Sequence, residues 1–400
     1  MSNIQKLLQG VEVEWKPLGE VLVRTKGTRI TAGQMKVFHK DGAPLKIFAG
    51  GKTVAFVDYK DIPEKDINKE PSIIVKSRGI IEFEYYDKPF SHKNEMWSYH
   101  SKYENIDVKF VYHYLRINEP YFQNIASRMQ MPQISTPDTE KFIIPIPPLS
   151  VQQKIVEILD KFTELTAELT AELTARKKQY VFYREQLLMV NDKWLRNGKE
   201  VEWKSLGNKD FFEISSGGTP LTTKNEYWDK GNVPWLKSES CNNISVYSAN
   251  YFITELGLKK SSAKLLNKNT TLIALVGATI FKTAYLEFEA ATNQNIASIK
   301  SLKTAIVKDK YVFYYLTNLY EFLKSEMRNY GMLNLTKLRT FQIPIPPLEE
   351  QARIVAILDK FDTLTTSISE GLPREIELRQ KQYEYYRNLL LTFPKANELK

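Results

Sequence analysis

The 400-residue chain has few of the features that would place it outside the cell or in a membrane. It contains a single cysteine, Cys241, so no disulfide can form within the chain and a reducing compartment is expected. Residues 1–10 contain no apolar stretch typical of a secretory signal. The longest apolar stretch, Thr271–Phe281, is much shorter than the roughly 20 residues that a membrane helix needs, and it predicts a buried strand. We therefore expect a cytoplasmic chain with no membrane segment.

Patterns that carry catalysis or bind metals are also scarce. We find no Gly-x-x-x-x-Gly-Lys-Ser/Thr loop for ATP, no Asn/Asp-Pro-Pro-Tyr/Phe sequence for amino methylation, and no glycine-rich loop suited to S-adenosylmethionine. Glu14-Trp-Lys16 and Glu202-Trp-Lys204 have the Glu-x-Lys spacing of many nucleases, but no Pro-Asp lies suitably upstream of either and both fit an edge strand better. The four histidines lack the close spacing of a zinc site. The sequence thus predicts no catalytic residue, no metal ligand and no cofactor bound by this chain.

The chain has more basic than acidic residues. The chain has 56 Lys and Arg against 47 Asp and Glu, which gives a formal net charge of +9 and a pI near 9.1. Such a balance favours an anionic partner, with nucleic acid as the first candidate. The length leaves room for two or three domains, each with its own core.

The second half of the sequence repeats a frame found in the first. Residues 144–162 (IPIPPLSVQQKIVEILDKF) recur as residues 343–361 (IPIPPLEEQARIVAILDKF). Two shorter segments recur as well: Glu12–Lys16 as Glu200–Lys204, and Gln179–Arg184 as Gln382–Arg387. The inserts within this frame, about 20–140 and 208–340, share only scattered matches. A constant frame with different inserts indicates two readers of two different targets.

Each IPIPPL segment is followed by a long apolar stripe. The prolines favour an extended segment, and the apolar residues after them recur at steps of three and four. This spacing predicts a first helix of about 40 residues, roughly 60 Å long, and a second that Gly371 and Pro373 should bend or break. The expected coiled-coil contacts are Ile155, Leu159, Phe162, Leu165 and Leu169 in the first helix, and Ile354, Leu358, Phe361, Leu364 and Ile368 in the second. Two alternatives are that each helix packs on its own domain or pairs with another subunit.

The first helix contains a tandem tetrapeptide. Residues 163–174 consist of three four-residue units that each end in Glu-Leu-Thr. Each unit would lengthen a helix by about 6 Å. The repeat is either replication slippage that a solvent-facing helix tolerates or a ruler that sets the length of the helix.

Together these features resemble the specificity (S) subunits of type I restriction–modification systems over essentially the whole chain. The resemblance rests on the paired IPIPPL helices, the Glu-Val-Glu-Trp openings and the tetrapeptide run. The second insert also contains segments similar to the target-recognition domains of that family: Ser216–Pro220, Tyr227-Trp228, Val233–Leu236 and Asn293–Asn295. The first insert lacks the Gly-Gly-Thr-Pro stretch and has Phe48–Lys52 and Pro89–Lys93 instead.

The resemblance implies a DNA-binding subunit that reads two half-sites of duplex DNA. It implies docking of methylation (M) subunits, expected to be two, and of restriction (R) subunits. Adenine methylation with S-adenosylmethionine and cleavage driven by ATP, with Mg, would then belong to these partners, and this chain would be non-catalytic.

Candidate DNA contacts come from basic runs and from polar turns. In the first insert they are Arg24, Lys26, Arg29, Lys36, Lys76, Arg78 and Lys93. In the second they are Ser216, Gly217, Gly218, Thr219, Lys224, Lys237, Asn293, Gln294 and Asn295. A Gly-rich turn can offer backbone N–H groups to phosphate, and Asn and Gln can read adenine edges. The alternatives are a plain tight turn and solvated surface charge.

We therefore expect an α+β chain with two compact target-recognition domains separated by an antiparallel two-helix coiled coil, related by an internal pseudo-two-fold repeat. The expected domains are 1–145, 146–192, 193–344 and 345–400, alternating recognition domain and long helix. Two other functions are a single-chain nuclease or methyltransferase with a duplicated binding frame, and a coiled-coil adaptor whose inserts bind proteins.

Overall fold

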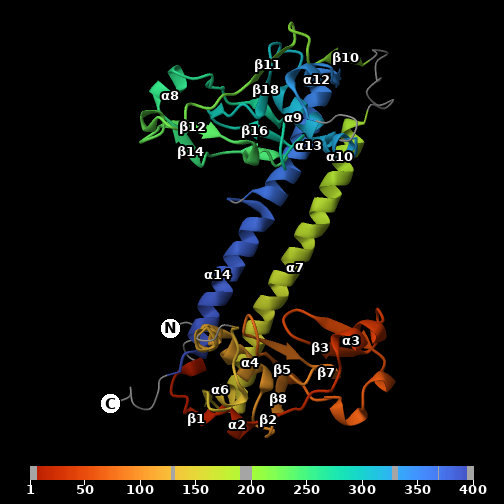
Figure 1. Cartoon of the computed structure of the whole chain (residues 1–400), viewed down its shortest axis with the longest axis vertical. Coiled ribbons are helices and arrows are strands. Elements are labelled where there is room, and N and C mark those ends of the chain that lie inside the picture. Colours follow the sequence, from red (N-terminus) through yellow and green to blue (C-terminus); the bar gives the residue numbers. More distant parts are fainter. Residues whose placement is uncertain (1–6, 128–130, 190–200, 327–331, 368, 394–400) are drawn as a thin grey trace. The chain divides into compact units, whose positions relative to one another are not determined.

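A computed structural model describes residues 7–127, 131–189, 201–326, 332–367 and 369–393. The chain divides into two compact units. Unit 1 comprises residues 1–167 and 378–400, and unit 2 comprises residues 168–377. Each unit therefore contains one insert together with a part of each long helical segment (Figure 1).

Unit 1 is built on two sheets. An antiparallel four-stranded sheet has the order β2-β8-β5-β6, and a three-stranded sheet has the order β4-β3-β7 with β3 and β7 parallel. The strands of unit 1 are β1 (Glu14–Pro17), β2 (Leu22–Arg24), β3 (Leu45–Phe48), β4 (Val54–Val57), β5 (Ser72–Lys76), β6 (Glu82–Tyr86), β7 (Phe90–His92), β8 (Trp97–Ser101) and β9 (Ile143–Ile146). The helices are α2 (Leu18–Val21), α3 (Ala32–Phe38), α4 (Val108–Ile117), α5 (Glu119–Ala126) and α6 (Thr136–Glu140), with short 3₁₀ turns η1 (Tyr59–Asp61) and η2 (Glu64–Asp66).

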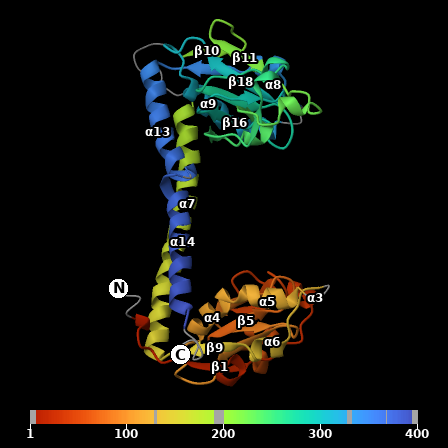
Figure 2. The ribbon, with the colours of Figure 1, turned by 90° about the vertical axis from the view of Figure 1, so that its left-hand side faces the viewer.

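The core of unit 1 lies where α4 and α5 cover the four-stranded sheet (Figure 2). Helix α4 presents a strongly apolar face, and its Phe110 and Val111 are fully buried. Phe83 of β6 meets Phe122 of α5 edge to face with 5.1 Å between ring centroids. Edge-to-face aromatic packing of this kind contributes beyond the area it buries.

Unit 2 repeats this arrangement and extends it by one strand. Its sheets have the orders β11-β18-β15-β16-β13 and β14-β12-β17, and β12 and β17 are parallel as β3 and β7 are in unit 1. The strands are β10 (Glu202–Ser205), β11 (Phe212–Ser216), β12 (Val233–Leu236), β13 (Ile244–Val246), β14 (Tyr251–Ile253), β15 (Thr270–Ala274), β16 (Thr283–Leu286), β17 (Ala291–Thr292), β18 (Ile296–Ser301) and β19 (Gln342–Ile345). The helices are α8 (Glu255–Lys259), α9 (Asp309–Asn318), α10 (Tyr320–Ser325) and α12 (Leu335–Arg339), with 3₁₀ turns η3 (Asn225–Tyr227) and η4 (Ser238–Ser240).

The repeated Glu-Val-Glu-Trp and IPIPPL segments pair with each other within each unit. Strand β1 pairs antiparallel with β9, and β10 pairs antiparallel with β19, in two separate two-stranded sheets. Proline cannot donate a ladder hydrogen bond, so Pro145 and Pro344 are tolerated because each of these strands has one partner only. The Glu-x-Lys segments are thus edge strands, as their positions predict.

The long helices have the predicted length and the predicted break. Helix α7 runs over 40 residues, Leu149–Leu188. The second helix is interrupted: α13 (Leu348–Thr366) ends before α14 (Gly371–Leu391) begins. Gly371 adopts φ +77°, and a Cβ there would lie 2.4 Å from a backbone oxygen of Thr363. The break therefore requires glycine.

The two helical segments pair in antiparallel orientation, and an aromatic contact recurs in both units. In unit 1, Phe162 from the first half of α7 stacks on Tyr386 near the end of α14, with 5.5 Å between ring centroids. In unit 2, Phe361 of α13 stacks on Tyr183 from the last part of α7, with 5.6 Å between centroids. The recurring Gln-Tyr-x-x-Tyr-Arg segment supplies the partner tyrosine each time.

The first turns of each long helix are buried in the core of their own unit. Ile155 and Leu159 are fully buried in the core of unit 1, and Ile354 and Leu358 are fully buried in that of unit 2. The alternative that each long helix packs on its own domain therefore applies to its first turns.

We call the line of contact between α7 and the α13–α14 segment the seam. Not every apolar residue of the stripe faces it. Leu165 is 44 % exposed, whereas its neighbour Thr166 and then Leu169 are partly buried. From Leu159 the less exposed positions advance by three, four and three residues, and this spacing selects Thr166 instead of Leu165. Leu364 is partly buried, and Ile368 lies outside the described residues.

A glutamine explains why the IPIPPL segment and its helix are repeated as one block. Gln152 is fully buried; its Oε1 accepts from the Asp107 N–H at 2.8 Å, and its Nε2 donates to the Asn105 and Pro147 carbonyls at 3.2 and 2.7 Å. In unit 2, Gln351 makes the same three contacts, with the Lys308 N–H and the Ile306 and Pro346 carbonyls. Each glutamine ties the start of its long helix to the loop before α4 or α9.

Candidate nucleic-acid interface

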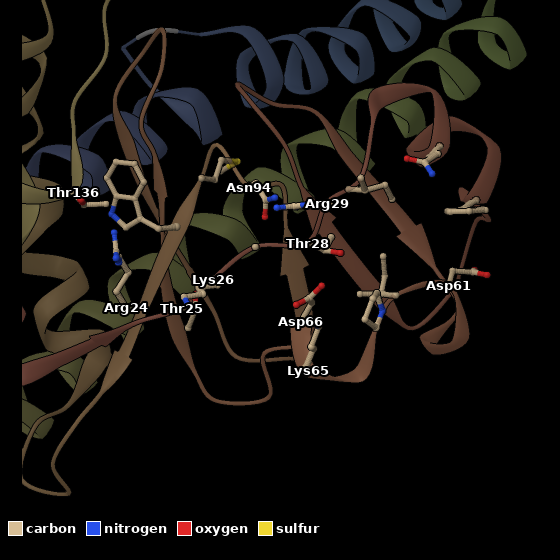
Figure 3. A pocket seen from close by; sticks show the side chains of 18 residues that line it. Arg24, Thr25, Lys26, Thr28, Arg29, Asp61, Lys65, Asp66, Asn94 and Thr136 are labelled. Carbon is tan, nitrogen blue, oxygen red and sulfur yellow. The ribbon is translucent and has the colours of Figure 1, made fainter.

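A cavity of about 830 Å³ opens on unit 1 beside the end of β2 (Figure 3). The end of β2 and the residues that follow it, Arg24–Ile30, line one side, and residues 61–63, Lys65, Asp66 and Asn94 line others. Arg24, Lys26, Arg29 and Lys65 contribute four positive charges to the lining, against the carboxylates of Asp61 and Asp66. The cavity therefore carries a net positive charge, as a site for an anionic ligand requires.

The basic residues of this cavity differ in whether a carboxylate lies close enough to neutralise their charge. Arg24 lies 3.6 Å from a carboxylate oxygen of Glu140. Lys26, Arg29 and Lys65 are exposed, and no ion pair joins any of them to a described carboxylate. These three cations remain available to a ligand, while Arg24 is partly compensated.

The cavity owes its shape to two loops that cross closely. A Cβ on Gly27 would lie 2.5 Å from the His92 carbonyl oxygen and 2.6 Å from that of Lys93. The Thr28 N–H donates to the His92 carbonyl at 2.8 Å, and the Lys93 N–H donates to the Phe48 carbonyl at 2.9 Å. Only glycine allows this approach, so the loop after β2 is fixed on the loop between β7 and β8.

The side chain of His92 also stabilises the crossing of these two loops. It is fully buried, with Nε2 3.1 Å from the Thr25 hydroxyl and Nδ1 3.0 Å from the Lys93 carbonyl. Burial lowers the pKa of His92, although the Lys93 carbonyl opposes this. A neutral ring that donates to the carbonyl and accepts from Thr25 satisfies both nitrogens.

Unit 2 contains the same crossing with different residues. A Cβ on Gly217 would lie 2.1 Å from the Thr292 carbonyl oxygen. The Gly218 N–H donates to that carbonyl at 2.8 Å, and the Asn293 N–H donates to the Leu236 carbonyl at 2.9 Å. Matching hydrogen bonds therefore align Gly27 with Gly217, and His92 with Thr292.

This alignment corrects the expectation that the first insert lacks a counterpart of the Gly-Gly-Thr-Pro stretch. The counterpart is Gly27–Ile30, which shares only its first glycine with Gly217–Pro220. Pro89–Lys93 is instead the counterpart of the segment that leads into Asn293. Sequence comparison misses the match because the loops are equated by hydrogen bonds to a distant strand. The one local signal is a glycine within three residues of the end of a short strand.

Several predicted basic contacts in unit 1 are committed to neighbouring carboxylates. Lys76 lies 3.0 Å from Glu84 and 3.5 Å from Glu82, and Lys93 lies 2.6 Å from Glu95. Strand pairing brings Lys76 opposite Glu82, so the pairing of β5 with β6 creates this ion pair. The structure thus brings Arg24, Lys26 and Arg29 together in the charged cavity. The charge of Lys76 is instead balanced by the carboxylates of β6.

The remaining predicted residues of unit 1 lie elsewhere. Exposed Lys36 and ion-paired Lys93 line a second cavity of about 470 Å³. Exposed Arg78 forms an isolated bridge with Gln133.

In unit 2 the backbone N–H groups of the predicted glycine turn donate to carbonyls of the protein itself. The Gly217 and Gly218 N–H groups donate to the Ile296 and Thr292 carbonyls, so neither is free for a phosphate. Asn293 is buried, and its Oδ1 accepts from the Asn295 N–H at 3.2 Å. The plain tight turn is the reading that these bonds favour.

Other predicted side chains of unit 2 face outward. Gln294 is exposed, and its Oε1 accepts from the Thr219 hydroxyl at 2.5 Å. The ammonium of Lys237 lies over the Tyr251 ring, 3.6 Å from its centroid. Lys224 is exposed and lies 3.7 Å from Glu226, and Ser216 is partly buried at the end of β11.

The described part of the chain holds no cluster of three His, Cys, Asp or Glu residues able to bind a metal ion. Within that part, no helix is long and apolar enough to cross a membrane.

Two β-rich units that repeat one topology, joined by long antiparallel helices, define a duplicated recognition scaffold. The type I restriction modification DNA specificity domain matches residues 12–176 and again residues 200–378. The chain is 37 % identical to the specificity subunit of the type I restriction enzymes EcoR124I and EcoR124II of Escherichia coli, over 99 % of this chain and 98 % of that protein. It is 33 % identical to a putative type I specificity subunit of Haemophilus influenzae, over 98 % of each.

A solved structure has the same fold. The S subunit of a type I system from M. genitalium matches 99 % of this chain and 100 % of its own length, with a TM-score of 0.62 at 16 % identity. The chain therefore belongs to the type I restriction–modification specificity subunits. It is a DNA specificity subunit with two target-recognition domains, a non-catalytic component of such a system.

Proposed function

We propose that this chain reads a bipartite sequence of duplex DNA, with unit 1 contacting one half-site and unit 2 the other. The observation that carries the proposal is the loop crossing that occurs in both units with the same backbone bonds but with different outward side chains. A shared scaffold with different outward polar side chains is what two domains that recognise different base sequences require. The free lysines of the unit 1 cavity, Lys26 and Lys65, would contact phosphate.

The frame also supports docking of two copies of a methylation subunit. Phe182 and Tyr385 occupy equivalent places in the repeated Gln-Tyr-x-x-Tyr-Arg segment, and they are 58 % and 64 % exposed. Exposed aromatic residues are enriched at protein–protein contacts. Because the frame occurs twice, it offers the same surface twice. Restriction subunits would join the complex, with S-adenosylmethionine, ATP and Mg bound by the partners, in the cytoplasm.

The test is to purify the chain with its methylation partner and to measure binding to random duplex DNA by selection and gel shift. The expected result is enrichment of one sequence with two separated halves, and adenine methylation within it that depends on the partner. A single-chain nuclease or methyltransferase would modify DNA without the partner, and a protein-binding adaptor would select no sequence. Either outcome would overturn the proposal.

A further inference from the structure

The two loop crossings can be compared position by position, because the same backbone bonds fix both. The alignment places Lys26 with Ser216 and Arg29 with Thr219. On the other loop it places Asn94 with Gln294. These three positions are the tips of the crossing in each unit.

One inner pair of hydroxyls keeps its chemistry in both crossings, whereas two of the three tip positions do not. Below the tips, the Thr25 hydroxyl contacts that of Ser98 in unit 1, and the Ser215 hydroxyl contacts that of Ser298 at 2.9 Å in unit 2. At the tips, unit 1 carries two cations and an amide, and unit 2 carries two hydroxyls and an amide. Two of the three tip positions therefore differ in charge between the units, and the third differs in the length of its amide side chain.

The tip side chains are placed for contact with a ligand. Arg29 and Asn94 both line the unit 1 cavity and are exposed, and neither makes a side-chain hydrogen bond or ion pair with a described residue (Figure 3). Gln294 is exposed, and the Thr219 hydroxyl fixes which end of its amide is the oxygen. The crossing holds the backbone beneath all of them, so they are preorganised.

We propose that Arg29 and Asn94 are specificity-determining residues for the first half-site, and that Gln294, oriented by Thr219, is one for the second. This inference rests on the proposed function and deepens it. Arginine matches the O6 and N7 acceptors of guanine, and the amides of Asn and Gln match N6 and N7 of adenine. Arg29 thus reads a guanine, and Asn94 and Gln294 each read an adenine. Lys26, a compact charge on a flexible stem, contacts phosphate instead.

The test uses the full chain in complex with its methylation subunit and the bipartite site that the wild-type complex selects. Duplexes with one base pair changed at each position are compared by gel shift for wild type and for Arg29→Ala, Asn94→Ala and Gln294→Ala. Each variant should lose about tenfold or more of its preference at one position, in the first half-site for the first two and in the second for the third. Preference at every other position should remain.

Two control variants separate base reading from general binding. Lys26→Ala should weaken binding to all duplexes alike and reduce the dependence of affinity on salt. Gln153→Ala, which removes an exposed glutamine on α7, should change nothing. The inference is overturned if the tip variants discriminate among the duplexes as wild type does, or if each variant alters both half-sites. If the wild-type complex selects no bipartite site, the proposed function itself fails.

Discussion

Gln152 gives the sharpest test of why the frame is repeated. Its amide is fully buried and makes three hydrogen bonds: two join the start of α7 to the loop before α4, and the third goes to the Pro147 carbonyl just before α7. Replacing Gln152 with alanine removes all three and leaves the Asp107 N–H and the Pro147 carbonyl without their partner in a buried place. The variant should destabilise unit 1.

The size of the effect follows from the number of groups left unsatisfied. A buried donor or acceptor that loses its partner costs about 1–3 kcal/mol. Two such groups and a small cavity give a loss of about 3–5 kcal/mol in the free energy of unfolding, after some relaxation of the loop. Domains are stable by roughly 5–15 kcal/mol, so the loss should be readily measured.

The assay is urea unfolding of the full chain, followed by circular dichroism. Gln153→Ala is a matched control, because it removes the same residue type one position later from an exposed site, and it should shift the midpoint hardly at all. Gln351→Ala should reproduce the Gln152→Ala effect in unit 2. A loss below about 1 kcal/mol for Gln152→Ala would refute the reasoning, because the glutamine would then not tie helix to loop.

Three further predictions concern the seam, the tetrapeptide and the loop crossing. Phe162→Asp should cost about 2–4 kcal/mol because it places a charge against the aromatic seam, whereas Leu165→Asp should cost under about 1 kcal/mol, measured by urea unfolding; equal costs would contradict the assigned seam. Deleting Ala171–Thr174 removes about 6 Å of helix, so the gap between half-sites should shrink by one or two base pairs in a map of methylated adenines; an unchanged gap would mean that the repeat is slack. Gly217→Ala would place a Cβ 2.1 Å from a carbonyl oxygen and should abolish preference for the second half-site in the gel shift, while Gly50→Ala, with open space around its Cβ, should not; normal preference in Gly217→Ala would show that the crossing is not needed.

The frame could be predicted from the sequence because its signals are local and occur twice. The prolines of IPIPPL require an extended segment, and the stripe after Leu149 requires a helix. The break at Gly371 is equally local, since Gly and Pro stand two residues apart. The fold class follows from these repeats, whatever the inserts contain.

The seam was harder to predict residue by residue. Leu165 and Thr166 both fit steps of three and four, and hydrophobicity favours the leucine. The structure instead leaves Leu165 exposed, because the positions before and after fix the phase of the helix. Packing, not the hydrophobicity of a single residue, decides which of two neighbours faces a partner.

The site was harder still, because its geometry depends on contacts between distant segments. The equivalence of Gly27 and Gly217 appears only in their hydrogen bonds to the strands that contain His92 and Thr292. Similarly, Lys76 is a free cation in the sequence and becomes an ion-paired one only when β6 lies beside it.

The central claim is that the two units read DNA independently on one repeated frame. The most direct measurement replaces residues 208–340 with the corresponding insert of a related specificity subunit and maps methylated adenines in a genome that carries the hybrid and its partners. The account predicts that one half-site changes, while the other half-site keeps its sequence. A change in both halves, or in neither, would contradict it.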